Sequence, residues 1–314
     1  MSMSESECFD LLTLNTAVFY ELDEKSDRRR SVRCLEKFFF KACGNLGPQV
    51  FIEAGAKDAS SARRARSYLP SARIVAFEAN PVNFDSFQAD PKNTELDVEY
   101  LNYALSSSDG SVVFHVRTID GLKAIDGQGS MLPRAREDGI ETTSVEVAAV
   151  RLDRFFASTI DRPAERCAMW VDVEGALAPV LEGAGKLLDC VDLMFVEVED
   201  RPIWEDQWLR QDVLAYLEGF GLVPVARDYQ SRYQYNIVLA RRDLLNNARF
   251  RFLLAEHLSR SGAWFREKIK RRVEEEVESA VPERREDTLE KSVRRGQLVS
   301  RLKKFVSRRF RTLS

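Results

Sequence analysis

The chain has 314 residues, of which 44% are hydrophobic and 31% are charged, so it is expected to fold around one sizeable core. This composition excludes disordered and fibrous proteins. The net charge of -3 conceals an asymmetry, since residues 1–240 have 26 Lys and Arg against 39 Asp and Glu, whereas residues 241–314 have 21 against 11. The two parts therefore differ in purpose.

Targeting and redox signals point to the cytoplasm. The first ten residues are polar and acidic, which is not the pattern of a secretory signal. No uncharged apolar run approaches the roughly 18 residues that a membrane-spanning helix needs. The five cysteines are widely spaced and form no CxxC pair, which argues against a disulfide framework and a zinc site.

In chain order, residues 1–47 are predicted to form a helical lead-in, which ends at the turn-forming stretch Gly44–Pro48. Beyond it, β-rich runs alternate with helical segments, a pattern typical of a parallel sheet with crossover helices. Antiparallel strands are expected at Val112–Arg117 and Val145–Val150, around a polar loop at 120–139. The seven main strands are predicted at Val50–Ala54, Arg73–Glu78, Val98–Asn102, Ala168–Val173, Leu193–Val198, Leu222–Arg227 and Tyr235–Ala240.

These elements divide the chain into a lead-in (1–47), a cofactor-binding domain (48–242) and a charged helical C-terminal extension with a basic end (243–314). The last two main strands are expected to pair antiparallel. Seven strands that close in such a hairpin indicate an α/β sheet of the methyltransferase type rather than a six-stranded dinucleotide-binding sheet.

The first strand ends in Glu53 and a lone Gly55, where the chain turns toward a helix. The glycine allows a ligand to approach the backbone, and the helix N-terminus offers N–H groups. A pyrophosphate site would need G-x-G-x-x-G, which is absent here. Glu53 instead suits the ammonium group of S-adenosylmethionine. The alternative is that Gly55 only forms a tight turn.

A second acidic strand end, Glu78, follows Glu53 by 25 positions, close to the roughly 20-residue offset at which a carboxylate reaches ribose hydroxyls. Asn80 and Pro81 then begin a helix, and the same residues could serve only as its cap. Both acidic strand ends together predict an S-adenosylmethionine site. The candidate contacts in this unit are Glu53, Gly55, Ala56, Asp58, Glu78, Ala79 and Asn80.

Six motifs between Val50 and Ala240 resemble the FkbM family of S-adenosylmethionine-dependent methyltransferases. They are Phe51–Gly55, Ala76–Pro81, Asn102–Leu105, Gly129-Ser130, Arg151–Asp153 and Val171–Gly175. The resemblance implies a class I Rossmann-like fold and O-methylation of a small-molecule or glycan acceptor, commonly on a sugar or secondary metabolite. It also implies that Asn102 and Ala104 contact the adenine and that Ser130 lies near the active site. The alternative for Asn102 is a strand-terminal asparagine in a turn. Two departures are Lys57-Asp58-Ala59, where a second glycine is usual, and Leu177, where the family often has glutamate.

Asp172 and Glu174 are the candidate catalytic residues, because they follow a strand at the edge where open α/β sheets bind ligands. If the strand continued through them, both carboxylates would point to one face. One could deprotonate an acceptor hydroxyl and the other hold the cofactor, with no metal required. His115 is a further candidate base. The alternative is that both acids cap the following helix.

Glu197 and Glu199 end a later strand and could line the acceptor pocket with Trp204 and Trp208, or lie in a solvated strand end beside core aromatics.

The C-terminal segment 291–314 has nine Lys and Arg and no acidic residue, with Leu298, Leu302 and Phe305 at helical spacing. Such a helix can bind an anionic membrane or polymer, which would place the protein at the inner membrane face, or it can dock on the acidic body. Nucleic acid is disfavoured, because no recognised binding module is present.

The favoured function is thus S-adenosylmethionine-dependent O-methylation. The alternatives are a non-catalytic cofactor-binding scaffold held by its basic tail and, less favoured, an NAD-type oxidoreductase. The acceptor and the oligomeric state are left open.

Overall fold

The structure is a computed structural model, which describes Phe9 and residues 24–119, 123–124, 129–136, 139–160 and 165–259. All of these belong to the first of two units of the chain, Met1–Phe265 and Arg266–Ser314. The basic segment 291–314, for which membrane contact is predicted, lies outside the described residues. None of the described helices is long and apolar enough to cross a membrane.

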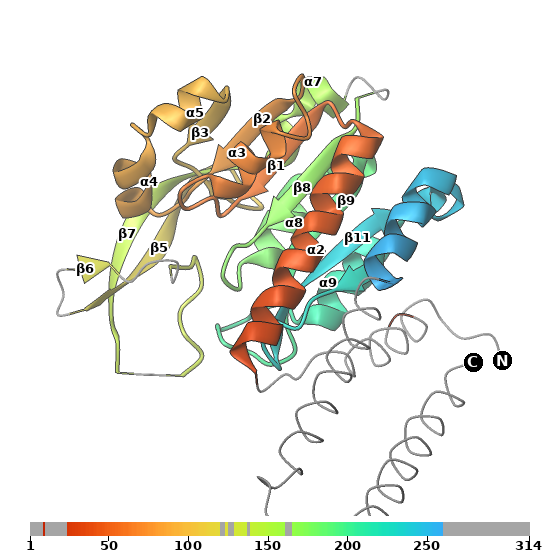
Figure 1. The fold of residues 1–314 in the computed structure, drawn as a ribbon. Helices are drawn as coiled ribbons and strands as arrows, with labels where there is room; N and C mark the ends of the chain where they lie inside the picture. The colour runs from red at the N-terminus through yellow and green to blue at the C-terminus, as the bar shows by residue number, and fades with distance from the viewer. Residues whose placement is uncertain are drawn as a thin grey trace, which may run out of the picture. The chain divides into compact units, whose positions relative to one another are not determined.

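A seven-stranded sheet forms the centre of the described part, with strand order β10-β11-β9-β8-β1-β2-β3 (Figure 1). Its strands are β1 (Val50–Ala54), β2 (Arg73–Phe77), β3 (Val98–Leu101), β8 (Cys167–Val171), β9 (Val191–Glu199), β10 (Leu222–Arg227) and β11 (Gln234–Arg241). All neighbours pair in parallel except β11, which is antiparallel to both β9 and β10. The predicted α/β class I methyltransferase sheet, with its closing antiparallel hairpin, is therefore confirmed.

A second sheet, with order β4-β7-β5-β6, interrupts the chain between β3 and β8. Its strands are β4 (Ala104–Leu105), β5 (Gly110–Ile119), β6 (Lys123–Ala124) and β7 (Glu141–Val150). The two long strands, β5 and β7, pair antiparallel over nine residue pairs, as their alternating pattern predicts. The two-residue strands β4 and β6 are too short to leave such a pattern.

Helices cover both faces of the main sheet. The helices are α2 (Lys25–Leu46), α3 (Ser60–Arg66), α4 (Pro81–Phe87), α5 (Pro91–Glu95), α6 (Leu152–Phe155), α7 (Ala157–Ile160), α8 (Leu177–Ala184) and α9 (Arg210–Glu218), with 3-10 turns η1 (Gly185–Cys190) and η2 (Arg242–Asn246). One core lies between the sheet and α2, α3 and the helical residues 248–259. The other lies between the sheet and α8 and α9.

The lead-in helix α2 is part of the core. Its apolar stripe includes Phe39 and Phe40, which are fully buried, and the ring of Phe40 stacks on Trp170 of β8 at a centroid distance of 5.6 Å. Figure 1 shows α2 crossing one face of the sheet. Buried aromatic side chains each contribute roughly 1.5–3 kcal/mol by leaving water. Gly47 ends the helix in the left-handed conformation, with its N–H bonded to the Cys43 carbonyl.

Candidate active site

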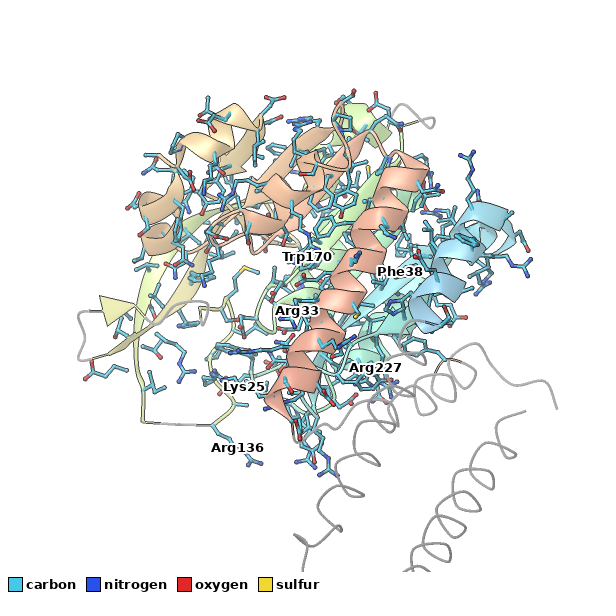
Figure 2. All side chains as sticks on the ribbon, viewed as in Figure 1. Lys25, Arg33, Phe38, Arg136, Trp170 and Arg227 are labelled. Carbon is cyan, nitrogen blue, oxygen red and sulfur yellow. The ribbon has the colours of Figure 1, made fainter. Side chains whose placement is uncertain are left out.

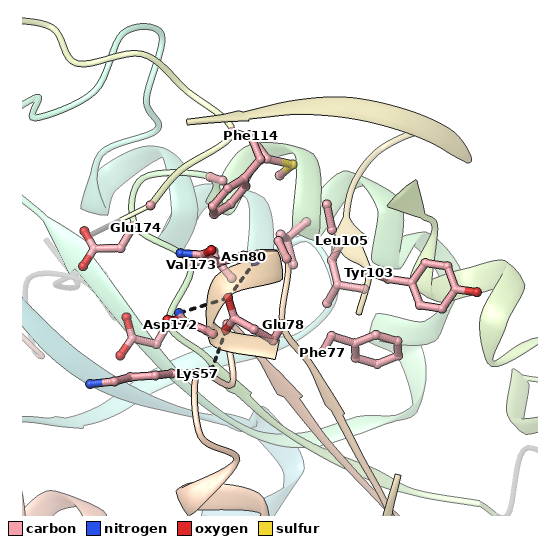
Figure 3. A pocket seen from close by; sticks show the side chains of 18 residues that line it. Lys57, Phe77, Glu78, Asn80, Tyr103, Leu105, Phe114, Asp172, Val173 and Glu174 are labelled. Carbon is pink, nitrogen blue, oxygen red and sulfur yellow. Dashed lines mark hydrogen bonds between the residues drawn. The ribbon is translucent and has the colours of Figure 1, made fainter. Parts of the chain in front are cut away.

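A cavity of about 260 Å³ opens at the carboxyl ends of the parallel strands. Its walls come from the turns after β1, β2 and β8, from the β3–β4 connection, and from β5 and the residues that follow Gly129. Figure 3 shows Asp172 and Glu174 at one end of the cavity and Phe77 and Tyr103 at the other. The cavity therefore has an acidic end and an aromatic end.

Gly55 is the point where the backbone leaves β1 and meets the turn after β8. It lines the cavity with φ +78, a conformation that L side chains rarely adopt, and a Cβ there would overlap the carbonyl oxygen of Asp172. Gly55 thus forms a turn, as the alternative supposes, but this turn is also part of the cavity wall. Lys57 and Ala59 have left-handed φ values of 49 and 58, a conformation that glycine adopts more readily than residues with side chains.

Glu78 follows β2, lines the cavity and is 5% exposed. Its Oε2 accepts a hydrogen bond from the Lys57 N–H at 2.5 Å, and its Oε1 accepts one from the Asn80 N–H at 2.8 Å. Burial raises its pKa. Oε1 also accepts the Asn83 side-chain amide at 3.4 Å, and since a carboxylate has about four acceptor positions, one on Oε2 is available to a ligand. Asn80 also lines the cavity and caps α4 through its bond from the Val82 N–H, so the capping alternative holds as well.

Glu53 does not line the cavity, which leaves the expected contact with a cofactor ammonium without geometric support. Side chains alternate along β1, so Glu53 shares its face with Phe51 and lies toward α3. There its Oε2 accepts a hydrogen bond from the Ala62 N–H at 2.8 Å. Burial raises its pKa to about 8.

This buried carboxyl predicts a loss of stability as the pH rises from about 4.5 to about 8. Because its pKa is raised from 4.5 to about 8, Glu53 binds its proton more tightly in the folded chain, and the unfolding free energy falls as pH rises between these values. Glu53→Gln cannot ionise and should flatten this fall by a few kcal/mol, at about 1.4 kcal/mol per pKa unit. Urea unfolding from pH 5 to 9 measures it, with the exposed Glu205→Gln as control. An unchanged slope in Glu53→Gln would contradict the assignment.

The other predicted cofactor contacts divide into two groups. Ala79 and Ala104 line the cavity, as do Gly55, Glu78, Asn80 and Asp172. Ala56, Asp58, Asn102 and Ser130 do not; they hold the cavity walls. Asn102 donates to the Glu78 carbonyl at 2.8 Å, and Ser130 Oγ donates to the Glu174 carbonyl at 2.6 Å. Asp58 accepts from the Ser60 N–H at the start of α3.

Asp172 and Glu174 both line the cavity, although the strand does not continue through them. Strand β8 ends at Val171, and Glu174 lies in a turn with a left-handed φ of 37, followed by Gly175 with φ 80. The same-face argument from strand alternation is therefore wrong for this pair. The capping alternative is also wrong, because the N-cap residue of α8 is Ala176 and no side chain caps the helix. A strained turn at a cavity is typical of functional sites.

Four carboxyl groups gather at the acidic end. Burial, followed by repulsion from Asp172, raises the pKa of Glu174 to about 8 and that of Glu199 to about 7. Burial raises the pKa of Asp172, and burial followed by repulsion from Asp172 and Glu174 raises the pKa of Glu197. The cluster thus contains groups that exchange protons near neutral pH.

His115 is the least suitable of the three candidate bases. Its neighbour Phe114 lines the cavity, and because side chains alternate along β5, His115 points to the opposite face. Its Nδ1 lies 3.0 Å from Ser144 Oγ. Within the described ranges, no group of three or more His, Cys, Asp or Glu side chains is arranged to hold a metal ion.

The sequence patterns did not identify the apolar walls or the cation of the site. Phe77, Tyr103, Phe114 and Met131 line the cavity but are dispersed along the chain. Lys57 also lines it and lowers the pKa of Asp172 electrostatically. Figure 3 shows its side chain extending toward Asp172. The sequence feature that could have pointed to Lys57 is its position in the loop Lys57-Asp58-Ala59, which departs from the family pattern.

Residues 53–233, more than half of the chain, match the family described as Methyltransferase FkbM domain. A curated relative, the 2-O-methyltransferase NoeI of Sinorhizobium fredii (strain NBRC 101917 / NGR234), is 26% identical over 185 residues, which cover 55% of this chain and 73% of the relative. Among solved structures, precorrin-6y C5,15-methyltransferase from Geobacter metallireducens GS-15 has a TM-score of 0.33 and 13% identity, covering 62% of this chain and 79% of that one. A SAM-dependent methyltransferase from Aquifex aeolicus has a TM-score of 0.34 and 11% identity, covering 76% and 100%.

Proposed function

We propose, because the chain belongs to the FkbM methyltransferase family, that this methyltransferase moves a methyl group from S-adenosylmethionine to a hydroxyl oxygen. The observation that supports this most is the cavity itself. It has a buried carboxylate after β2 for a ribose, apolar walls for an adenine, and carboxyl groups of raised pKa at the opposite end.

The residues present fit the cofactor chemically. Glu78 offers its remaining acceptor position to a ribose hydroxyl, while Phe77, Tyr103 and Leu105 offer apolar surface to a base. At the acidic end, Asp172 and Lys57 form a matched pair of charges. An amino-acid end group has one ammonium and one carboxylate, so Asp172 would hold the first and Lys57 the second. In this proposal Lys57 and Asp172 take the role that the sequence suggests for Glu53.

S-adenosylmethionine supplies a methyl group on a positively charged sulfur when it is bound. The chain must align the acceptor oxygen and remove its proton. Glu174 has a pKa of about 8 and lines the cavity, so its ionised form would accept that proton at neutral to mildly alkaline pH. The Ser130 hydroxyl, bonded to the Glu174 carbonyl, would keep the turn in place.

The proposal also covers the acceptor, the location of the protein and its domain boundaries. The acceptor hydroxyl on a sugar, glycan or secondary metabolite is supported by the family and by the 2-O-methyltransferase relative at 26% identity. Location in the cytoplasm, with the basic C-terminal segment on an anionic membrane, and the domain boundaries at 47 and 242 stay predictions.

Calorimetric titration with S-adenosylmethionine, S-adenosylhomocysteine and NADH tests the proposed cofactor. We expect both adenosyl compounds to bind and NADH not to bind. Binding of NADH alone would favour an oxidoreductase. Binding of none of the three would contradict the proposed cofactor. Binding of the adenosyl compounds without methyl transfer would favour the non-catalytic cofactor-binding scaffold.

A ribose preference tests Glu78 directly. Wild-type protein should bind adenosine at least tenfold more tightly than 2′,3′-dideoxyadenosine, and Glu78→Gln should remove most of that preference, because charged hydrogen bonds contribute roughly 1.5–3 kcal/mol. Isothermal titration measures both ligands. The exposed Glu95→Gln on α5 is the matched control and should keep the preference. A preference that persists in Glu78→Gln would remove the residue from ribose binding.

A further inference from the structure

Three arginines at the catalytic edge of the sheet lie over tyrosine rings. The guanidinium of Arg227 lies 3.3 Å from the ring centroid of Tyr235, and that of Arg201 lies 3.7 Å from the centroid of Tyr233. Arg232 lies over the same Tyr233 ring at 5.4 Å. We name this group the arginine–tyrosine rim; its members are Arg201, Arg227, Arg232, Tyr229, Tyr233 and Tyr235.

The rim is at the same edge as the carboxyl cluster. Strand β11 begins at Gln234, which pairs with Glu199 at the end of β9, so the β10–β11 connection lies beside the acidic end of the cavity. Two further contacts lie at this edge of the sheet. Gln207 Nε2 donates to Glu199 Oε2 at 2.7 Å, and the side chain of Trp204 is so close to Gly175 that a Cβ there would overlap it. Gln234 Nε2 also donates to Glu197 Oε2 at 3.0 Å, so the rim adjoins the carboxyl cluster to which Glu174 belongs, outside the residues that line the cavity itself.

The neighbouring carboxylates are engaged by other groups. Asp200 forms an ion pair with Arg210 at 3.1 Å and accepts the Tyr235 hydroxyl. Asp228 is buried and accepts the N–H and side-chain amide of Asn236. No ion pair among the described residues involves a rim arginine. Stacking on a ring fixes the plane of a guanidinium, and Arg227 Nε donates to the Asp228 carbonyl at 3.0 Å, so the terminal N–H groups are the ones that suit an oxyanion.

The start of α2 adds more positive charge to the same place. The Tyr229 N–H donates to Ser31 Oγ at 2.9 Å, which fixes the first turns of α2 beside the rim. Lys25, Arg29 and Arg33 are exposed on these turns. Figure 2 shows Lys25 and Arg33 on the helix with Arg227 near its beginning. Charges of one sign beside a cavity concentrate ligands of the other sign.

From this arrangement we propose that the acceptor is anionic and has a phosphoryl group that binds the arginine–tyrosine rim, with its methylated hydroxyl directed to Glu174. Phosphoryl oxygens match the donor geometry of several guanidinium groups at once. The alternative is that the rim only offsets the buried carboxyl cluster. This inference rests on the proposed function for the identity of the reaction, but phosphate recognition is measured without it.

Binding of glucose 1-phosphate and of glucose, measured by titration calorimetry without cofactor, tests the rim. We expect wild-type protein to bind the phosphate ester at least tenfold more tightly than glucose. Arg227→Gln should reduce this advantage about tenfold, and so should Arg201→Gln/Arg232→Gln, in which both arginines are exposed and a folding defect is not expected. Arg242→Gln, which follows β11 at the opposite edge and pairs with Glu218, should keep the full advantage.

Equal affinity for the two sugars in wild-type protein would overturn the inference, and so would an equal loss in Arg242→Gln. Binding of phosphatidylglycerol vesicles that depends on the rim arginines, without a preference for glucose 1-phosphate, would overturn it in favour of a membrane contact. If the rim binds phosphate but the protein does not bind S-adenosylmethionine, the rim inference holds and the proposed function is contradicted. If the protein binds S-adenosylmethionine but the rim does not bind phosphate, the proposed function holds and the rim inference is contradicted.

Discussion

Glu174→Gln is expected to lower kcat by about 10²–10⁴ while S-adenosylmethionine still binds, because positioned general bases contribute roughly that factor. In wild-type protein, kcat/KM should rise with pH until Glu174 is ionised, near its pKa of about 8. Glutamine keeps the size of the side chain but accepts no proton, so the rise should disappear. Methyl transfer from radiolabelled cofactor across pH 6–9 measures both effects, once an acceptor is identified.

Two comparisons make this experiment specific. Glu182→Gln changes one exposed carboxylate on α8 and should leave the pH profile intact. Asp172→Asn should weaken cofactor affinity as well as kcat, since Asp172 is proposed to hold the cofactor ammonium. A Glu174→Gln variant with normal turnover and a normal profile would show that another group is the base.

Gly55→Ala is expected to abolish cofactor binding. The added Cβ would overlap the Asp172 carbonyl oxygen, and the backbone has φ +78. The left-handed conformation alone costs roughly 1–2 kcal/mol for a residue with a side chain. The overlap must additionally separate the turns after β1 and β8, which form adjoining walls of the cavity. We expect at least a 100-fold loss of S-adenosylmethionine affinity by calorimetry, together with a lower melting temperature.

Gly47→Ala separates the two causes. Gly47 has a similar φ of +64, but a Cβ there would meet nothing within 4 Å. This variant should therefore lose only the conformational part of the stability and bind the cofactor normally. If Gly47→Ala and Gly55→Ala behaved alike, backbone strain would explain the result, and the contact with Asp172 would not matter for the site.

The strand positions followed well from the sequence, because buried strands of a parallel sheet are continuous apolar runs between turns. Continuous burial is also the reason why the sequence did not predict that Glu53 lies toward α3. All five residues of β1 are buried, so the sequence offers no alternation that tells which face Glu53 occupies, and its contact with Ala62 depends on where α3 packs.

The site was predictable where it follows strand ends, as at Gly55, Glu78 and Asp172. Its other parts depend on distant segments that meet only in the folded chain. Phe114 reaches the cavity from the second sheet, and the arginine–tyrosine rim needs the pairing of β11 with β9. Short strands such as β4 leave no pattern in the sequence, so only the two long strands of the second sheet, β5 and β7, were predicted.

The walls of the cavity come from different stretches of the chain. Gly55 through Leu105, together with Asp172, supply the walls assigned to the cofactor, whereas Gly129, Met131 and Glu174 line the side assigned to the acceptor. Evolution can therefore change the acceptor loops without disturbing the residues that hold the methyl donor. Such a separation gives one scaffold access to many acceptors, and relatives of this chain are expected to diverge most in those loops.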